Sequence, residues 1–109
     1  MARTDIKTPP APLESTIVKS IISYLNRIPG ARAKKIHGSS YSAGWPDVLC
    51  VLNGRAIFIE VKRPAPYGTP VTKIQQAELA AWAKAGAVTG VARSVEDVKK
   101  IVEGVMPTS

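Results

Sequence analysis

Apolar residues in the first third of the chain recur at three- and four-residue spacing, which predicts an amphipathic helix from about Leu13 to a stop at Pro29-Gly30. The apolar positions of this helix are Leu13, Ile17, Val18, Ile21, Ile22, Leu25 and Ile28. Residues 1–12 contain three prolines and few apolar side chains, so we expect a flexible N-terminal arm there. The domain is then expected to span residues 13–105, followed by a C-terminal tail at 106–109.

Two apolar runs, Val48 to Leu52 and Ala56 to Val61, are separated by Asn53-Gly54. Asn-Gly between β-branched runs predicts a hairpin with a type I′ turn, because both central residues of that turn need a positive φ. Both runs are apolar almost throughout, which is typical of strands buried on both faces. A shorter strand is expected before them, at Ala33 to His37.

The second half of the chain carries clear helix signals. Thr72 followed by Gln75 predicts a capping box at the start of a second helix, which ends near Ala85. Ala87 to Ala92 reads as a strand, and Ser94 is placed to cap a last helix. The order α-β-β-β-α-β-α predicts an α/β fold with a small mixed β-sheet flanked by helices.

The hairpin places two acidic residues together. Counting back from a turn at Asn53-Gly54 puts Asp47 opposite Glu60. Cross-strand partners have Cβ atoms about 4.5–5.5 Å apart, and two like charges at that distance destabilise a sheet. Something must compensate for this repulsion, and a hard divalent cation such as Mg²⁺ is the natural candidate.

Lys62 follows Glu60 by two residues, so its side chain leaves the same face of the sheet. Carboxylates that bind Mg²⁺ leave positions for water and phosphate, and a nearby lysine can orient or deprotonate that water or stabilise charge on the phosphorane. The pattern therefore suits phosphodiester hydrolysis. The alternative is a cross-strand ion pair in which Lys62 neutralises Glu60, while Asp47 caps the loop behind Pro46.

Charge and composition narrow the class of protein. The chain has 15 Lys and Arg against 8 Asp and Glu, a net charge of +7, which makes polyanions plausible partners, although surplus lysine can also serve solubility alone. The apolar share of 45% excludes a disordered tail, a collagen or a coiled coil. One cysteine, Cys50, excludes an internal disulfide, and no apolar run is long enough for a membrane span or signal peptide. These features fit a cytoplasmic protein without membrane association.

Two short motifs flank the apolar hairpin: Gly44-Trp45-Pro46-Asp47 and Glu60-Val61-Lys62. Together they resemble the motif of the PD-(D/E)xK nuclease superfamily. The surrounding sequence is similar to the VRR-NUC branch of that superfamily. In that branch a helical Glu precedes the G-x-P-D motif, and a Gln follows E-x-K at the start of the next helix. Glu14 and Gln75 match these two positions. The resemblance covers residues 13 to 103 and implies a restriction-endonuclease-like core.

The resemblance also implies a Mg²⁺- or Mn²⁺-dependent endonuclease. The residues that it implies for catalysis are Asp47, Glu60, Lys62, Glu14 and Gln75. It makes Asp47 and Glu60 direct metal ligands, helped by the backbone carbonyl of Val61, and lets Glu14 reach the metal through water. Lys62 would act on the attacking water, and Gln75 would position the lysine or the phosphate. Alternatively, Glu14 merely favours the positive end of its helix, and Gln75 merely completes the capping box.

The substrate that the resemblance implies is branched DNA, such as four-way (Holliday) junctions or flaps, in a bacterial or phage-infected cell. Two symmetric incisions imply a homodimer, and no small-molecule cofactor is expected. One alternative is a non-catalytic nucleic-acid-binding module that uses the same fold and basic face. Another is a structural or toxin-neutralising interaction protein that binds neither metal nor DNA.

Basic residues near the motifs are candidates for contacts with nucleic acid. They are Lys34, Lys35, His37, Arg63 and Lys73. Simple solvated charges are the alternative for the lysines and arginine, and an ordinary polar loop residue is the alternative for His37. Trp45 and Tyr41 could stack on a splayed base, or Trp45 could be a lid that packs over the sheet.

Overall fold

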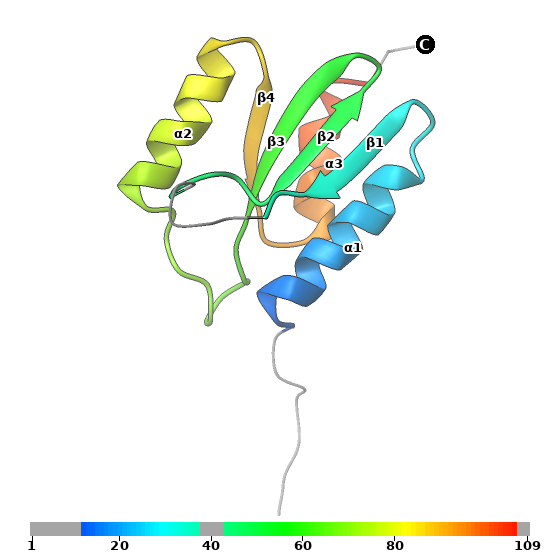
Figure 1. Cartoon of the computed structure of the whole chain (residues 1–109). Coiled ribbons are helices and arrows are strands. Elements are labelled where there is room, and N and C mark those ends of the chain that lie inside the picture. The colour runs from blue at the N-terminus through cyan, green and yellow to red at the C-terminus, as the bar shows by residue number, and fades with distance from the viewer. Residues whose placement is uncertain (1–11, 38–42, 107–109) are drawn as a thin grey trace, which may run out of the picture.

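A computed structural model of the chain describes residues 12–37 and 43–106 (Figure 1). The predicted arm up to residue 11, the loop at 38–42 with Tyr41, and the tail from residue 107 lie outside the described residues. The elements, in chain order, are α1 (Glu14–Asn26), β1 (Ala31–Lys35), β2 (Val48–Leu52), β3 (Arg55–Val61), α2 (Lys73–Lys84), β4 (Val88–Ala92) and α3 (Val95–Glu103). This order confirms the predicted α-β-β-β-α-β-α arrangement.

β1 begins two residues earlier than the sequence predicts. Gly30 has a φ of 85°, which turns the chain from α1 directly into the strand. The Asn26 side chain then fixes the start of β1, because its Nδ2 donates to the Ala33 carbonyl at 3.1 Å and its Oδ1 accepts from the Ala33 N–H at 2.8 Å. The strand therefore starts where the helix end holds it.

The four strands form one mixed sheet in the order β1-β2-β3-β4. β1 with β2 and β2 with β3 are antiparallel, whereas β3 and β4 are parallel and are joined through α2. Asn53 and Gly54 form the hairpin turn with φ values of 51° and 82°, as a type I′ turn requires. The predicted register is confirmed from Leu52–Arg55 to Val48–Ile59.

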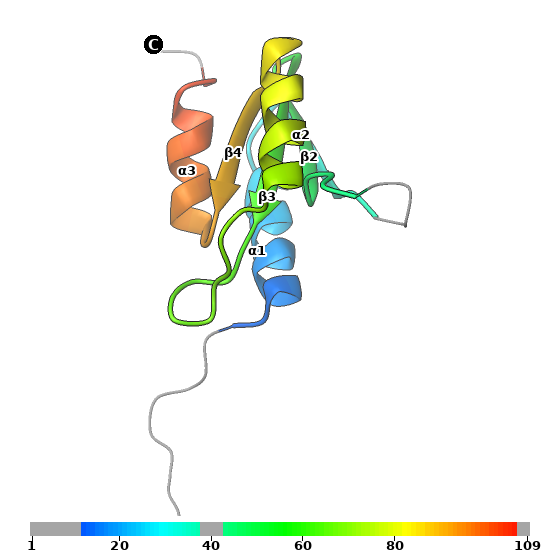
Figure 2. The same ribbon diagram turned by 90° about the vertical axis from the view of Figure 1, so that its left-hand side faces the viewer.

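Helices cover the sheet unequally. α1 and α3 contact each other and pack on one face, where they enclose the main core with side chains such as Ile21, Ile57 and Val98. α2 packs on the opposite face over β3 and β4, and Trp82 stacks on Phe58 there with ring centroids 4.3 Å apart. Figure 2 shows α3 and α2 on opposite sides of β4. None of the helices in the described part of the chain is long and apolar enough to cross a membrane.

The position of α2 corrects one prediction. Strand β3 is buried on both faces, as expected. Even Glu60, on the face toward α2, is only 3% exposed. Strand β2 is not, because Val51 is 42% exposed on the face that α2 leaves open. An apolar run thus marked a doubly buried strand correctly in β3 and wrongly in β2.

Candidate active site

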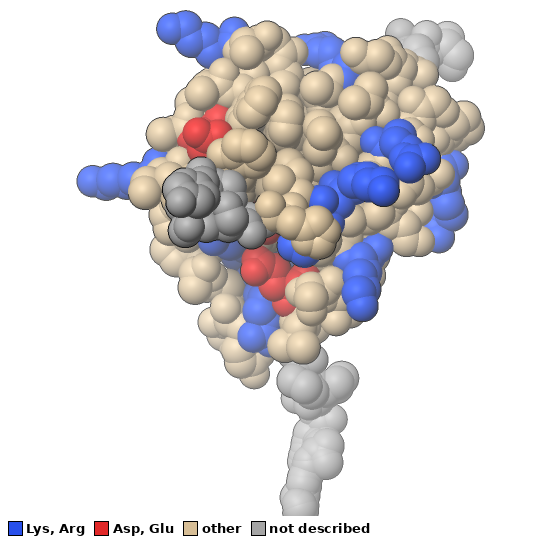
Figure 3. Space-filling view, in the orientation of Figure 1, with Lys and Arg blue, Asp and Glu red and all other residues tan. Residues whose placement is uncertain are grey.

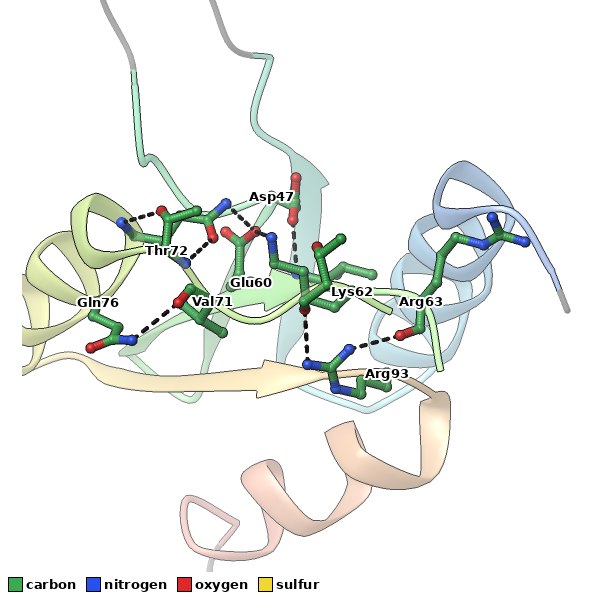
Figure 4. A network of polar contacts seen from close by, with 11 residues as sticks. Asp47, Glu60, Lys62, Arg63, Val71, Thr72, Gln76 and Arg93 are labelled. Carbon is green, nitrogen blue, oxygen red and sulfur yellow. Dashed lines mark hydrogen bonds and ion pairs between the residues drawn. The ribbon is translucent and has the colours of Figure 1, made fainter. Parts of the chain in front are cut away.

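The acidic pair lies at the end of the sheet where β2 begins and β3 ends, beside the first turn of α2 (Figure 4). Asp47 directly precedes β2, Glu60 is the second-to-last residue of β3, and Lys62 directly follows β3. Figure 4 shows Lys62 reaching back toward Glu60, with Asp47 beside them. The hairpin therefore brings together the three residues that carry the predicted chemistry.

Asp47 is fixed by its neighbours on both sides. Its backbone N–H donates to the Ile59 carbonyl at 3.0 Å, and its carbonyl accepts from the Ile36 N–H at 2.7 Å. Its side-chain Oδ2 accepts from the Val61 N–H at 2.7 Å, so the carboxylate binds across the hairpin. This leaves the Asp47 carboxylate facing the end of β3.

Glu60 is the most unusual residue of the site. Its Oε2 accepts from Gln75 Nε2 at 2.9 Å and lies 3.8 Å from Lys62 Nζ. Its Oε1 is buried and has no hydrogen-bond partner among the residues described. Burying a carboxylate oxygen without a hydrogen-bond partner costs free energy, so this atom is a candidate ligand for a bound cation.

Burial raises the pKa of Glu60 to about 8. The charge of Asp47 adds to this increase, Lys62 opposes it, and the charge of Glu14 raises the pKa further. In the metal-free protein Glu60 therefore carries a proton at neutral pH. A bound cation would favour the ionised form.

This raised pKa predicts how stability depends on pH. An unfolded glutamate ionises near 4.5, so between about pH 4.5 and 8 the folded state holds a proton that the unfolded state lacks. Stability of the metal-free protein should therefore fall as the pH rises through this window, by up to about 1.4 kcal/mol per pH unit. Calorimetric melting in EDTA at pH 5, 6.5 and 8 measures this decline.

The Glu60→Gln variant supplies the comparison, because it keeps the shape of the side chain and cannot titrate. It should lack most of the decline. Because the two proteins differ only at residue 60, the difference between their stability curves reports Glu60. Parallel stability curves for the two proteins would contradict the assignment.

Lys62 is buried against the pair, with 9% of the residue exposed. Its distance of 3.8 Å from Glu60 Oε2 makes this an electrostatic contact longer than a hydrogen bond. Its backbone N–H donates to the Ala92 carbonyl at 3.0 Å, which anchors the end of β3 to β4. The contact between Lys62 and Glu60 that the sequence offered as an alternative is present, and it places the ammonium beside the Glu60 carboxyl group.

Gln75 completes the capping box that the sequence offered as its alternative role, and it also contacts Glu60. Its Oε1 accepts from the Thr72 N–H at 3.0 Å, and its own N–H donates to Thr72 Oγ1 at 3.1 Å, which completes the capping box. Its Nε2 simultaneously donates to Glu60. The cap of α2 therefore orients one oxygen of the buried carboxylate.

Glu14 is the exposed first residue of α1. Its charge contributes to the raised pKa of Glu60, so it is close enough to act on the site electrostatically. Within residues 12–37 and 43–106, however, no three Asp, Glu, His or Cys side chains converge as a metal-ligand group. A metal would thus take Asp47 and Glu60 as its side-chain ligands, and Mg²⁺ is often held by one or two carboxylates with waters completing the shell.

The comparisons with known proteins come from structure alone. No family model matches the sequence, and no curated protein matches it significantly. One solved structure, described as "VRR_NUC domain", superposes with a TM-score of 0.69 at 26% identity, over 85% of this chain and 97% of that one. A second, described as "VRR_NUC domain protein", has a TM-score of 0.67 at 17% identity, over 86% of this chain and 88% of that one. The chain has the fold of a VRR-NUC domain. This match confirms the resemblance seen in the sequence and the α/β class.

In this VRR-NUC fold the predicted basic residues separate into two groups. Lys34 lies opposite Leu49, which leaves the sheet on the same face as Asp47, whereas Lys35 lies opposite the core residue Val48 and points to the other face. His37 is exposed just beyond β1. Figure 3 shows acidic side chains low on the open face of the sheet, with Lys and Arg around them.

The other two basic residues flank the site along the chain. Lys73 is the exposed first residue of α2, two residues before Gln75. Arg63 follows Lys62, and its guanidinium donates to the Pro12 carbonyl at 3.0 Å and lies over the Tyr67 ring at 4.7 Å. These contacts link the start of the loop after β3 to Pro12 and to Tyr67. Trp45 is 47% exposed, so it does not form a closed lid over the sheet.

Sequence reasoning missed Arg93, which lies directly after β4 and contacts the loop that follows Lys62. The signal for it was indirect. A parallel strand after a crossover helix tends to return beside its predecessor, which would have placed residues after Ala92 next to those after Val61. The strand itself was predicted, but its partner was not.

Proposed function

We propose that this protein is a Mg²⁺- or Mn²⁺-dependent endonuclease that hydrolyses phosphodiester bonds in branched DNA. The observation that carries the proposal is Glu60: a buried carboxylate with one partnerless oxygen, beside Asp47 and Lys62. A hard cation satisfies that oxygen and removes the repulsion between the two carboxylates. The match to a VRR-NUC domain structure supports a nuclease.

The donor set fits the proposed metal. Asp47 and Glu60 would hold it with the backbone carbonyl of Val61, and Glu14 would reach it through water. When bound, the ion would polarise a phosphoryl oxygen and increase the acidity of a coordinated water. The chain supplies the other functions of the site.

Lys62 is the residue placed to act on the attacking water or on the charge that develops on the phosphate. Its ammonium lies 3.8 Å from Glu60 Oε2, which places it beside the proposed metal site. Gln75 fixes Glu60 Oε2 and thereby leaves Oε1 as the oxygen available to the metal. Burial of Glu60 and Lys62 keeps water from screening these interactions.

The proposal is tested with a panel of labelled substrates: duplex, flap, splayed and four-way DNA, each with and without Mn²⁺. We expect cleavage only with the metal, and faster cleavage of branched than of linear DNA. A non-catalytic nucleic-acid-binding module, the principal alternative, would bind these substrates equally well without a divalent ion and cleave none of them. Absence of cleavage on every substrate with Mn²⁺ would contradict the proposal.

Lys34 and Lys35 provide a matched pair for the DNA-binding face. Lys34→Ala removes a cation on the face that carries Asp47, and Lys35→Ala removes the same charge from the other face. We expect the first change to weaken DNA binding several-fold and to reduce the salt dependence by about one counterion, and the second to do neither. Fluorescence anisotropy across a salt series measures both. Equal losses in the two variants would show that only total charge matters.

We also propose that the active form is a homodimer, because symmetric incision of a junction needs two sites. The open apolar surface beside α2 supports this proposal. It is a groove of about 470 Å³ whose lining includes Leu49, Val51, Phe58 and Trp82. Exposed apolar surface of this kind favours association. Light scattering should return twice the 11.6 kDa mass of one chain, and a monomer that cuts both strands of a junction would contradict the proposal.

A further inference from the structure

The loop between Lys62 and Thr72 is tied at both ends by one side chain. Arg93 Nη1 donates to the Arg63 carbonyl at 2.8 Å, and Nη2 donates to the Thr69 carbonyl at 3.1 Å. Figure 4 shows the Arg93 guanidinium lying under this loop. One planar group therefore sets the separation between the start and the end of the loop.

Arg93 is itself held by the fold. Ala92, its neighbour, pairs with Val61 across the parallel strands. The backbone N–H of Arg93 donates to Asp97 Oδ2 at 2.8 Å in the first turn of α3. The backbone N–H of Asp97 donates in turn to Oγ of the capping residue Ser94 at 3.2 Å. The guanidinium thus extends from a position that β4 and α3 both fix.

The loop packs closely over this guanidinium. Gly68 has no space for a side chain, because a Cβ there would meet the Arg63 carbonyl and Arg93 Nη1. Only glycine lets the backbone approach the arginine in this way. Gly68 therefore packs directly against the hydrogen bond between Arg93 and the Arg63 carbonyl.

We propose that Arg93 is a positioning residue for the active site, an inference that rests on the proposed function. Both of its acceptors are backbone carbonyls, so it acts on Lys62 and Gln75 through the chain that joins them. Those two residues converge on the same atom, Glu60 Oε2, from opposite ends of the loop. Arg93 fixes their spacing.

The metal ligands depend on Arg93 much less. Asp47 and Glu60 belong to the hairpin, whose backbone bonds hold them without the loop. Removing the guanidinium should therefore displace Lys62 and Gln75 while leaving cation binding intact. A displacement of about 1 Å in a positioned group can cost up to a hundredfold in rate, so we expect kcat to fall at least about tenfold.

The test compares Arg93→Ala with Arg55→Ala. Arg55 also donates to a backbone carbonyl, that of Gly86 at 3.3 Å, but it lies next to the hairpin turn at the other end of β3. Each variant loses one positive charge, and Arg93→Ala loses two arginine-to-carbonyl hydrogen bonds where Arg55→Ala loses one. The readouts are kcat and KM for a labelled four-way junction with Mn²⁺, Mn²⁺ affinity by calorimetry, and the NMR signals of the Lys62 amide and the Gln75 side-chain amide.

For Arg93→Ala we expect the loss in kcat, changes in KM and Mn²⁺ affinity below about threefold, and shifted Lys62 and Gln75 signals. Arg55→Ala should change none of these. Arg93→Lys should have a higher kcat than Arg93→Ala, because an ammonium can replace one of the two hydrogen bonds but cannot make both as the planar guanidinium does. Wild-type kcat in Arg93→Ala, or unmoved NMR signals, would overturn the inference.

Gly68→Ala provides a second route that leaves the charge unchanged. It should lower kcat as Arg93→Ala does, and the double variant should be no worse than the poorer single variant, because both changes disrupt one contact. Multiplied losses would overturn the inference. If the wild-type protein cleaves nothing, the proposed function fails, and the NMR comparison still decides whether Arg93 positions Lys62 and Gln75.

Discussion

Asp47→Asn should abolish metal-dependent cleavage while leaving the fold intact. Asparagine has the same shape, and its amide oxygen can still accept from the Val61 N–H, so the link across the hairpin survives. What disappears is the negative charge that a divalent cation requires. We expect the cleavage rate to fall by about three orders of magnitude, equivalent to about 4 kcal/mol of transition-state stabilisation. Single-turnover cleavage of a labelled four-way junction with Mn²⁺ measures this loss.

Two further variants control this experiment. Glu60→Gln should be equally inactive, whereas Glu103→Gln, the same change in an exposed residue of α3, should cleave like the wild type. Circular dichroism and DNA binding should be close to normal in all three proteins. Cleavage by a folded Asp47→Asn protein at the wild-type rate would refute the assignment of Asp47.

Lys62→Met should separate catalysis from metal binding. Methionine keeps much of the length of the side chain but removes the ammonium, so the group that acts on the attacking water is lost while both carboxylates remain. We expect a loss of about a hundredfold in kcat, in the range that a positioned acid–base or electrostatic group contributes. Calorimetry should still detect a Mn²⁺ site, unlike in the Asp47 and Glu60 variants.

Lys100→Met serves as the control for that change, because Lys100 is an exposed lysine in α3, away from the site. It should retain wild-type kcat. If Lys62→Met loses Mn²⁺ binding together with activity, Lys62 merely supports the carboxylates structurally. If it retains wild-type kcat, Lys62 has no role in the reaction. Either result contradicts the account.

The hairpin explains why the centre of the site could be predicted from sequence. Asn53-Gly54 specifies one turn type, and that turn fixes the register all the way to Val48 and Ile59. Asp47 and Glu60 come next, so local chemistry alone brings them together. The capping box gave the start of α2 in the same way, through contacts between residues three apart.

Features that depend on how distant elements dock could not be predicted in this way. Val51 is exposed because α2 packs over β3 and β4 and leaves β2 uncovered. The apolar run of β2 does not indicate which strands the helix covers. Arg93 contacts Arg63 across 30 residues, through a parallel pairing that no turn specifies. Gln75 completes the capping box and also contacts Glu60, which it can do because its amide has a donor and an acceptor.

The central claim is that the Glu60 and Asp47 carboxylates form a cation site. Calorimetric titration of Mn²⁺ into wild-type and Glu60→Gln protein at pH 8 tests it most directly. The account predicts one Mn²⁺ site in the wild type, with release of about half a proton per Mn²⁺, because Glu60 with a pKa of about 8 is half-protonated at this pH. It predicts no such site in Glu60→Gln. Equal Mn²⁺ binding by the two proteins, or none by the wild type, would contradict it.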